Sequence, residues 1–473
     1  MARADTLKDA LLGAYQTNPT LQAARANQRA TDENVPIARS SGLPSASVTA
    51  SETEYLRQQG TGGGSGAGSG IDFNPERSLG ANLNVAVPIY SGGAVKNSVR
   101  AAKTRVEAGQ ADLRGTESSI FSQVVAAYMD VIQNEAIVGL RSNNVEVLQV
   151  NLQATSDRFE IGDLTRTDVA QSEARLALAR GDLRTAQANL IGSRERYISL
   201  VGKAPQDLQP PPPLPGFPAA VDDAVMTALD NNPDLIAARE SAKAAGYDVE
   251  VAGAGRLPKI ELFGTGGYTN YLGTLPDLSP TLPSDQASTT AQAGVRLTLP
   301  IFQGGRPAAQ ERQAQARQGA ALEQVIGTER DVIAQVRSAW ASWQAANTIV
   351  TETQSAVSAA ALSLEGVRAE NTVGNRTILD ILNAQQELLS AEVQLVTARR
   401  NAYVAGFTLI AAIGHAEARD LGLGDETMLY DPDVNYRRVR GKIWDWSFDP
   451  DPVAQSTRTV DIPAPDAEIP PSQ

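Results

Sequence analysis

The chain lacks cysteine entirely and has a single histidine, His415, among its 473 residues. The absence of cysteine excludes disulfides, thiolate metal sites and cysteine nucleophiles. One histidine excludes a His-rich metal site and argues against a catalytic triad. Aromatic residues make up only 5% of the chain although 42% is hydrophobic, so the apolar supply is mainly Ala, Val and Leu. This composition suits long, thin helical packing better than a thick core. Catalysis by carboxylates alone stays possible, but nothing in the composition calls for it, and we expect no enzyme activity, no metal and no cofactor.

Positive charge and long apolar runs are also scarce. The chain has 41 basic against 54 acidic residues, a net charge of -13, which disfavours nucleic-acid binding because that function needs a basic surface. No run of 18 apolar residues exists, so no membrane-spanning helix is predicted. No Gly-x-x-x-x-Gly-Lys loop is found, so we do not expect ATP hydrolysis. Residues 1–5 do not resemble the start of a signal peptide, so we expect either a cytosolic chain or a mature form whose signal peptide has been removed.

An internal repeat organises the sequence. Residues 18–25 match residues 232–239 in six of eight places at an offset of 214, and Pro88-Ile-Tyr-Ser-Gly-Gly93 recurs as Pro300-Ile-Phe-Gln-Gly-Gly305 at an offset of 212. Landmarks that recur in one order indicate two tandem copies of a unit. The expected divisions are a first copy at 5–202, a proline-rich connector at 203–218, a second copy at 219–414 and a tail at 415–473. We expect about the last 20 residues of the tail to be disordered.

Each copy is predicted to run helix, strand, loop, strand, long helix, turn, helix. The helices are expected at about 5–40, 95–160 and 166–200 in the first copy, and at about 220–255, 306–372 and 377–413 in the second. The strands are expected at about 45–55, 78–89, 259–271 and 290–301. Residues 60–70, rich in Gly, Ser and Ala, would form an exposed loop between the first two strands.

Apolar and polar residues alternate over about 11 residues in the second strand of each pair, long enough for a tilted strand to cross a bilayer. The sequence offers no second sheet to cover these strands, so a half-buried soluble sheet is the less favoured interpretation. We expect the apolar side chains to face lipid and the polar ones to face a water-filled interior. The lipid-facing positions are Leu83, Val85, Val87, Val295, Leu297 and Leu299.

Apolar residues recur every seven positions in the long helices, as at Val124, Val131 and Val138, which predicts helices that supercoil around neighbours. The proline-free span 95–160 would be about 100 Å long. The helix at 166–200 is about half that length. We therefore expect the helix at 220–255 to stack on its end, and the helix at 377–413 to be completed by residues 5–40 of a neighbouring copy. Such matching lengths predict a cylinder that one chain cannot close.

These features resemble the TolC family of outer-membrane efflux proteins. The resemblance covers both repeats and is carried by the paired Asn-Pro-x-Leu openings, the Leu-Pro strand entries, the Pro-Ile-Tyr/Phe-x-Gly-Gly junctions, and Val373-Gly-Asn-Arg-Thr-Ile-Leu-Asp380 with its partner at 158–168. It implies a mostly α-helical chain with a β-barrel contribution. Three copies would form a 12-stranded outer-membrane barrel continuous with a long periplasmic α-helical tunnel.

The resemblance also implies a function. The protein would lie in the outer membrane of a Gram-negative bacterium, extend into the periplasm, and serve as the passive exit duct of a tripartite efflux pump or a type I secretion system. The implied partners are two further copies of the chain, a periplasmic adaptor protein, an inner-membrane ABC or proton-driven transporter, and outer-membrane lipid. The cargo, drugs or a secreted protein, is not specified by the sequence.

A gate at the helix tips far from the strands is a further implication. Asp168 on the first tip would face Arg376 on the second, and Asp380 would point into the pore as part of an acidic ring. The residues carried over by motif are Thr167, Asp168, Arg376 and Asn371 for the gate, Asp380 and Asn383 for the constriction, and Gly162, Asp163, Gly374 and Asn375 for adaptor contact. Asn371 stands at the family's aromatic position and Asn383 at its second acidic position, so one link would be weaker and a single acidic ring would remain.

Simpler interpretations remain at these positions. Thr165 and Asp168 match a capping box, so Asp168 would then only cap a helix, and Arg376 would be a solvated surface charge. Trp340 and Trp343 are more typical of packing than of ligand contact. In the tail, Tyr430, Tyr436, Trp444 and Trp446 are expected to wrap the waist of the tube. The alternative function is a soluble, elongated coiled-coil scaffold with an accessory β-hairpin; a carboxylate hydrolase ranks third because no catalytic pair stands out.

Overall fold

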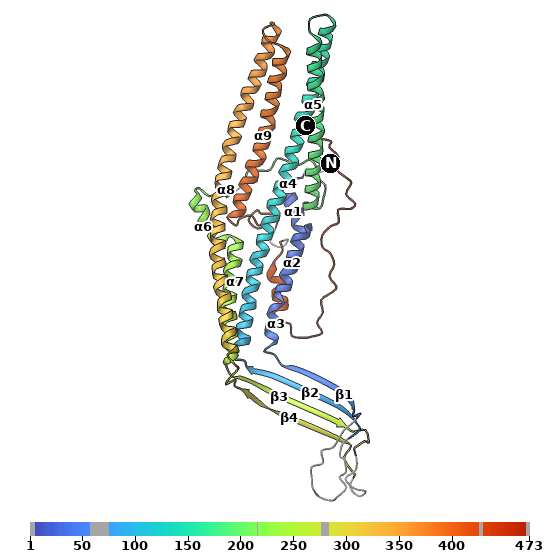
Figure 1. The fold of residues 1–473 in the computed structure, drawn as a ribbon, viewed down its shortest axis with the longest axis vertical. Coiled ribbons are helices and arrows are strands. Elements are labelled where there is room, and N and C mark those ends of the chain that lie inside the picture. Colours follow the sequence, from blue (N-terminus) through green and yellow to red (C-terminus); the bar gives the residue numbers. More distant parts are fainter. Residues whose placement is uncertain (1–4, 57–74, 215, 276–282, 425–428, 470–473) are drawn as a thin grey trace.

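The computed structural model describes residues 5–56, 75–214, 216–275, 283–424 and 429–469. Long helices run along most of the molecule and end in two separate hairpin tips, while a twisted sheet projects from the opposite end (Figure 1). None of the helices in these ranges combines the length and apolar character that a membrane crossing requires. The glycine-rich stretch 60–70 lies outside the described residues.

The four strands form one antiparallel sheet in the order β1-β2-β3-β4. Their bounds are β1 Ser45–Glu54, β2 Arg77–Tyr90, β3 Lys259–Asn270 and β4 Ala287–Thr298. Val48 pairs with Leu83, and Leu83 pairs with Gly266, so the register places the Val48 and Leu83 side chains on one face, beside Gly266. On the same face Leu262 lies between Val87 and Val295, since it pairs with both. The alternation in the sequence therefore produces one apolar face and one polar face shared by all four strands.

The predicted end of the fourth strand is wrong. We expected it to span 290–301 with Leu299 facing lipid, but β4 runs from Ala287 to Thr298, so Leu299 lies beyond it. The partner strand explains the shift. Thr298 pairs with Lys259, the first residue of β3, and Pro258 before it has no backbone N–H with which to continue the ladder.

Two helices dominate the molecule. Helix α4, Ala94–Glu160, and helix α8, Arg306–Thr372, each contain 67 residues, so each is about 100 Å long, as predicted. Each turns back into a shorter helix, α5 at Arg166–Val201 and α9 at Ile378–Ala412.

The predicted single helices at 5–40 and 220–255 are each interrupted. The first comprises α1 Leu7–Thr17, α2 Pro19–Asp32 and α3 Asn34–Ser40. The second comprises α6 Val221–Asn231, α7 Pro233–Gly253 and a 3-10 turn at Ala254–Arg256. The first break in each region falls at the repeated Asn-Pro pair. Proline is favoured in the first turn of a helix and the preceding residue is held extended, so Asn18 and Asn232 end one helix and cap the next.

The predicted stacking of the short helices is also wrong. The Asn18 amide donates to the carbonyl of Leu200 at the end of α5 (3.0 Å), so α5 meets the start of α2 in its own repeat. The Asn232 amide donates to the carbonyl of Ala412 at the end of α9 (3.1 Å), so α9 meets α7. Figure 1 shows both end-to-end pairs, α5 above α1–α3 and α9 above α7. Each repeat thus completes its own return path, because the last carbonyls of a helix need donors and the cap asparagine supplies one.

The main core lies at the waist, where α1, α2, α4, α5 and α9 converge with the tail. Phe121, Tyr128 and Tyr197 are fully buried there. The tail adds helix α10, Pro432–Val439, against α2, and Tyr430 packs against the core. The expectation for the tryptophans is wrong: Trp444 and Trp446 are exposed and do not wrap the waist.

The end of the tail, residues 450–469, contains no helix or strand but has a defined contact at its far end. The Arg194 guanidinium on α5 donates to the backbone carbonyls of Asp466 and Glu468, both at 2.9 Å, and to the Asp466 carboxylate. The tail therefore runs back along the outside of the helices (Figure 1).

Candidate functional site: the helix tips

The α4–α5 tip is a tight turn closed by its own groups. Gly162 has a φ of +82°, a conformation that glycine adopts without strain, and its N–H donates to the Phe159 carbonyl (2.9 Å). The Asp163 N–H donates to the Arg158 carbonyl (2.9 Å), and the two side chains form an ion pair at 2.7 Å. Gly162 and Asp163 are both exposed, as a contact surface at the tip requires.

The α8–α9 tip repeats this turn. Gly374 has a φ of +83° and its N–H donates to the Asn371 carbonyl (3.0 Å). The Asn371 amide in turn donates to the backbone carbonyl of Arg376 (2.7 Å). The Arg376 guanidinium binds Glu370 on its own hairpin (2.7 Å), and this contact raises the pKa of Arg376. Asn371 and Arg376 therefore both stabilise the local turn.

Capping boxes begin both return helices. The Asp168 carboxylate accepts hydrogen bonds from the Thr165 hydroxyl (2.7 Å) and backbone N–H (2.9 Å), and these bonds hold the pKa of Asp168 below its usual value. The Asp380 carboxylate accepts the same pair from Thr377, with the same direction of pKa change. The capping interpretation of Asp168 is confirmed. Both carboxylates are thus charged at neutral pH and oriented by their own helix.

The single chain does not bring Asp168 and Arg376 together. The two tips stand apart (Figure 1), and in the described parts of the chain no ion pair joins them. Thr167 is exposed beside Asp168 and Asn375 beside Gly374. In one chain these residues therefore lie on two separate tips, and Asp168 and Arg376 each bond to a residue of their own hairpin.

A link between the hairpins lies farther from the tips. The Arg175 guanidinium on α5 donates to the Asn383 side-chain oxygen on α9 at 2.8 Å. Apolar packing of Leu148, Leu176 and Leu382 accompanies it, from α4, α5 and α9. No pattern in the sequence pointed to Arg175, because its partner lies 208 residues away and no motif spans the pair. Asn383, expected only as part of the constriction, therefore also connects the two hairpins.

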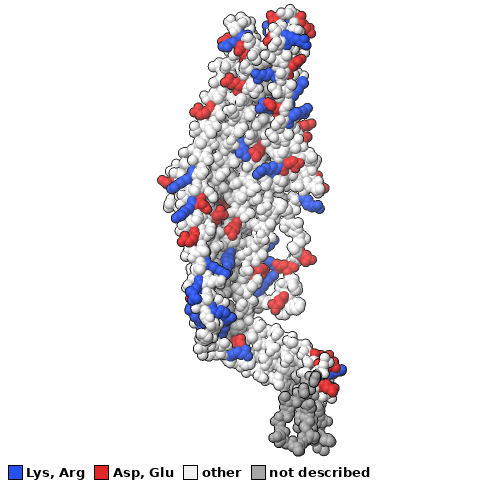
Figure 2. Space-filling model, in the orientation of Figure 1, with Lys and Arg blue, Asp and Glu red and all other residues white. Residues whose placement is uncertain are grey.

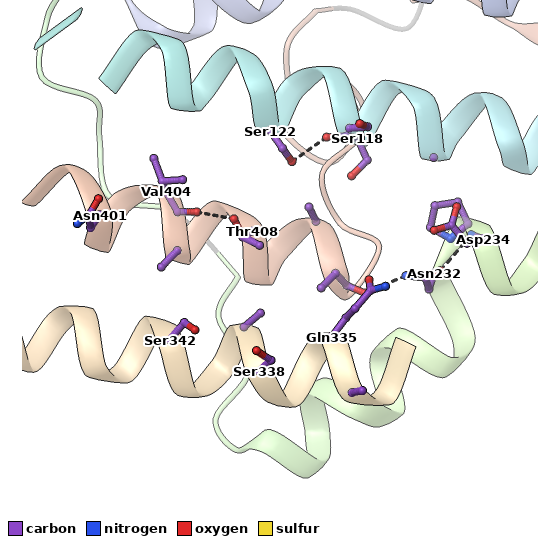
Figure 3. Close-up of a pocket in the computed structure, with 18 residues that line it drawn as sticks. Ser118, Ser122, Asn232, Asp234, Gln335, Ser338, Ser342, Asn401, Val404 and Thr408 are labelled. Atoms are coloured by element: carbon purple, nitrogen blue, oxygen red, sulfur yellow. Dashed lines mark hydrogen bonds between the residues drawn. The ribbon is translucent and has the colours of Figure 1, made fainter. Parts of the chain in front are cut away.

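A groove with a volume of about 800 Å³ lies at the waist, between α4, α8 and α9 and at the start of α7 (Figure 3). Its wall is made of small and hydroxyl side chains. Ser122 and Thr408 donate to carbonyls of their own helices, and Asn232 is occupied as a cap. Nothing in this wall pairs a nucleophile with a base. Across the described ranges, no three His, Asp or Glu side chains gather as a metal site would require.

Comparison with known proteins identifies the family. The family model described as "Outer membrane efflux protein" matches residues 12–203 and again residues 224–415, one match in each half of the chain. The chain belongs to the outer membrane efflux protein family. It is therefore an outer-membrane channel protein of the TolC type, and the duplication inferred from the sequence is confirmed.

Members of the outer membrane efflux protein family are similar over nearly the whole chain. The outer membrane efflux protein BepC of Brucella suis biovar 1 is 34% identical over 441 residues, which cover 93% of this chain and 92% of BepC. The outer membrane protein TolC of Escherichia coli K12 is 26% identical over 431 residues, 89% of this chain and 84% of TolC.

Solved structures share the fold. The CmeC outer membrane channel of Campylobacter jejuni aligns with a TM-score of 0.75 at 19% identity, covering 92% of this chain and 89% of CmeC. The outer membrane protein VceC of Vibrio cholerae aligns with a TM-score of 0.71 at 23% identity, covering 86% of this chain and 96% of VceC. The expected architecture, helices with a strand contribution built from a duplicated unit, is that of these proteins.

Proposed function

We propose that three copies of this chain assemble into one continuous exit duct, with a closed barrel of 12 strands in the outer membrane and a helical tunnel in the periplasm. The duct is passive, and an inner-membrane transporter supplies the energy through a periplasmic adaptor that binds the helix tips. The proposal rests on one observation: a single chain leaves both edges of its sheet unpaired and part of its helix surface uncovered.

The sheet supports assembly because it has two open edges. In the described chain β1 pairs only with β2, and β4 only with β3. A sheet with exposed edges is not tolerated in lipid, since each unpaired backbone group costs several kcal/mol there. Pairing β4 of one copy with β1 of the next removes both edges, and a barrel that closes after three copies contains 12 strands.

The helices support the same assembly. Helix α4 has 20 buried residues, whereas α8, with the same length, has only seven. Helix α4 packs against α1, α2, α3, α5, α7 and α9, whereas α8 packs mainly against α6, α7 and α9. Apolar side chains of α8 are exposed in the single chain, among them Leu322, Ile349 and Leu362. The flank of a neighbouring copy would cover them.

We place the gate at the tips. In the trimer the first tip of one copy adjoins the second tip of another, so Thr167 and Asp168 would meet Arg376, beside Asn371, across the subunit boundary. Asp380 and Asn383 would line the constriction, and the Arg175–Asn383 bond would limit how far the two hairpins of one chain separate. The exposed turns Gly162–Asp163 and Gly374–Asn375 would contact the adaptor.

Two relatives illustrate the range of cargo. The alkaline protease secretion protein AprF of Pseudomonas aeruginosa is 26% identical over 317 residues, and the cobalt-zinc-cadmium resistance protein CzcC of Cupriavidus metallidurans is 26% identical over 343 residues. One name concerns secretion of a protein and the other resistance to small toxic solutes. We propose either efflux of small solutes such as drugs or type I protein secretion for this duct. The inner-membrane transporter that co-purifies with it distinguishes the two. The soluble scaffold is not favoured, because the chain belongs to an outer-membrane family.

Single-channel conductance in planar bilayers tests the gate. Asp168→Asn retains the cap acceptor but removes the charge, so we expect it to raise conductance, as should Arg376→Ala and Arg175→Ala. Glu173→Ala is the matched control, because Glu173 is exposed on α5 and has no ion pair among the described residues. If Asp168→Asn and Arg376→Ala both conduct like the unmodified protein, the gate is not at these side chains.

A further inference from the structure

The tail contains a closed loop that exposes apolar side chains. Arg438 at the end of α10 binds both carboxylate oxygens of Asp449 (2.7 and 2.8 Å), and Lys442 binds one of them (3.1 Å). Arg39 on α3 donates to the backbone carbonyl of Arg440 (3.3 Å). The loop is therefore tied at its base and fixed to α3, so its conformation is set by contacts rather than by its own core.

The apolar residues of this loop point into solvent. Trp444 is 72% exposed and Trp446 is 73% exposed, and Ile443 and Phe448 are similar. Trp446 and Phe448 contact each other edge to face, with ring centroids 6.4 Å apart. Four large apolar side chains within six residues, held out by ion pairs, form the kind of patch that marks an interaction surface.

The position of the loop indicates what covers it. Trp444 and Phe448 line a hollow together with Ile37 of α3 and Leu43, two residues before β1 begins at Ser45. In Figure 1 the tail passes the lower end of α3, where the helices give way to the sheet. If the sheet crosses the bilayer, this level coincides with the headgroup layer on the helical side. Tryptophan is enriched at that level because its ring is apolar and its N–H is polar.

The Lys and Arg side chains at the same level are suited to contact with anionic lipid headgroups. Figure 2 shows Lys and Arg side chains gathered over the ends of α7 and α8 next to the sheet. Helix α4 begins with four cations, Lys96, Arg100, Lys103 and Arg105, before its first acid, Glu107. Arg100 and Arg105 recur 212 residues later as Arg312 and Arg317 on α8. A chain of net charge -13 thus concentrates cations where anionic headgroups would lie.

We infer that residues 443–448 form a membrane anchor that inserts Trp444, Trp446 and Phe448 into the headgroup layer of the leaflet on the helical side. The occupant of this patch is phospholipid, not a second copy of the chain. The inference rests on the proposed function, because it assumes that the sheet spans the bilayer. The tail, which belongs to neither repeat, would then attach the protein to the membrane in addition to the barrel.

Tryptophan fluorescence tests the anchor. The full chain is reconstituted in vesicles of phosphatidylethanolamine and phosphatidylglycerol whose acyl chains are brominated near the headgroup. The chain has four tryptophans. Trp340 and Trp343 lie on α8 about 50 Å from its first residue, too far to be quenched by lipid. We expect brominated lipid to quench the Trp340→Phe/Trp343→Phe variant strongly and the Trp444→Phe/Trp446→Phe variant hardly at all.

Two outcomes overturn the anchor. Emission from Trp444 and Trp446 that is quenched by aqueous acrylamide but not by brominated lipid would place the loop in water. Emission that neither agent quenches would place it against a neighbouring subunit. Light scattering and conductance on the same samples separate the two proposals. Conducting trimers without lipid quenching refute only the anchor, whereas a chain that forms no inserted trimer refutes the proposed function.

Discussion

The repeated cap asparagine offers a direct test of the end-to-end helix stacking. Asn232 is 4% exposed, accepts hydrogen bonds from the N–H groups of Asp234 and Leu235, and donates to the Ala412 carbonyl. Substitution by alanine removes an N-cap, at about 1 kcal/mol. It also leaves the partly buried Ala412 carbonyl without its donor, at about 1–3 kcal/mol. We therefore expect Asn232→Ala to lower the free energy of unfolding by about 2–4 kcal/mol.

Asn232→Asp separates the two contributions. Aspartate retains the cap acceptor but cannot donate to Ala412, and it places a negative charge beside the carbonyl end of α9. We expect Asn232→Asp to lower the free energy of unfolding by at least the cost of the unpaired Ala412 carbonyl, about 1–3 kcal/mol. The assay is urea unfolding of the detergent-solubilised chain, followed by circular dichroism at 222 nm. Asn347→Ala on the exposed face of α8 is the control, with an expected change within about 0.5 kcal/mol. If Asn232→Ala unfolds like this control, the junction does not hold the two helices together.

Other predictions concern a buried carboxyl and the strand faces. Burial raises the pKa of Glu117 to about 7, and its carboxylate accepts a hydrogen bond from the Ala418 N–H (2.6 Å). The folded state thus favours protonated Glu117, so stability should fall as pH rises from about 4.5 to 7, by on the order of 3 kcal/mol. Glu117→Gln should flatten this pH profile in urea titrations, and an unchanged slope would contradict the assignment. Leu83→Arg and Leu297→Arg should sharply reduce the trimer yield in outer-membrane fractions, because a lipid-facing charge costs roughly 2–4 kcal/mol. Asn84→Arg, on the polar face, should not; equal yields for all three would show that the faces are misassigned.

The fold was largely predictable from periodicity and repetition. Period-two alternation around Leu83 and Val295 identified the strands and their shared apolar face, because a strand alternates sides at every residue. The seven-residue spacing from Val124 and the absence of proline from 95–160 predicted a helix of about 100 Å. These signals are local, and each is set by the geometry of a single element.

Apart from the helix breaks at the Asn-Pro pairs, which are local, the errors concern contacts between elements. Asn18 and Asn232 were recognised as landmarks, but a cap motif does not specify which helix end its amide will meet. The predicted stacking partners were therefore wrong. The Arg175–Asn383 bond joins two helices through single side chains, with no pattern along either. The capping role of Asp380 was in principle visible, because Thr377 stands three residues before it, as Thr165 does before Asp168.

The number of copies in the detergent-solubilised particle tests the central claim most directly. Light scattering combined with refractive index and absorbance gives the protein mass alone. Three chains of 49.9 kDa predict about 150 kDa, and electron microscopy of the same particle should show three-fold symmetry around an open lumen. A particle of one chain that remains monodisperse without detergent, with its sheet folded against its own helices, would contradict the account.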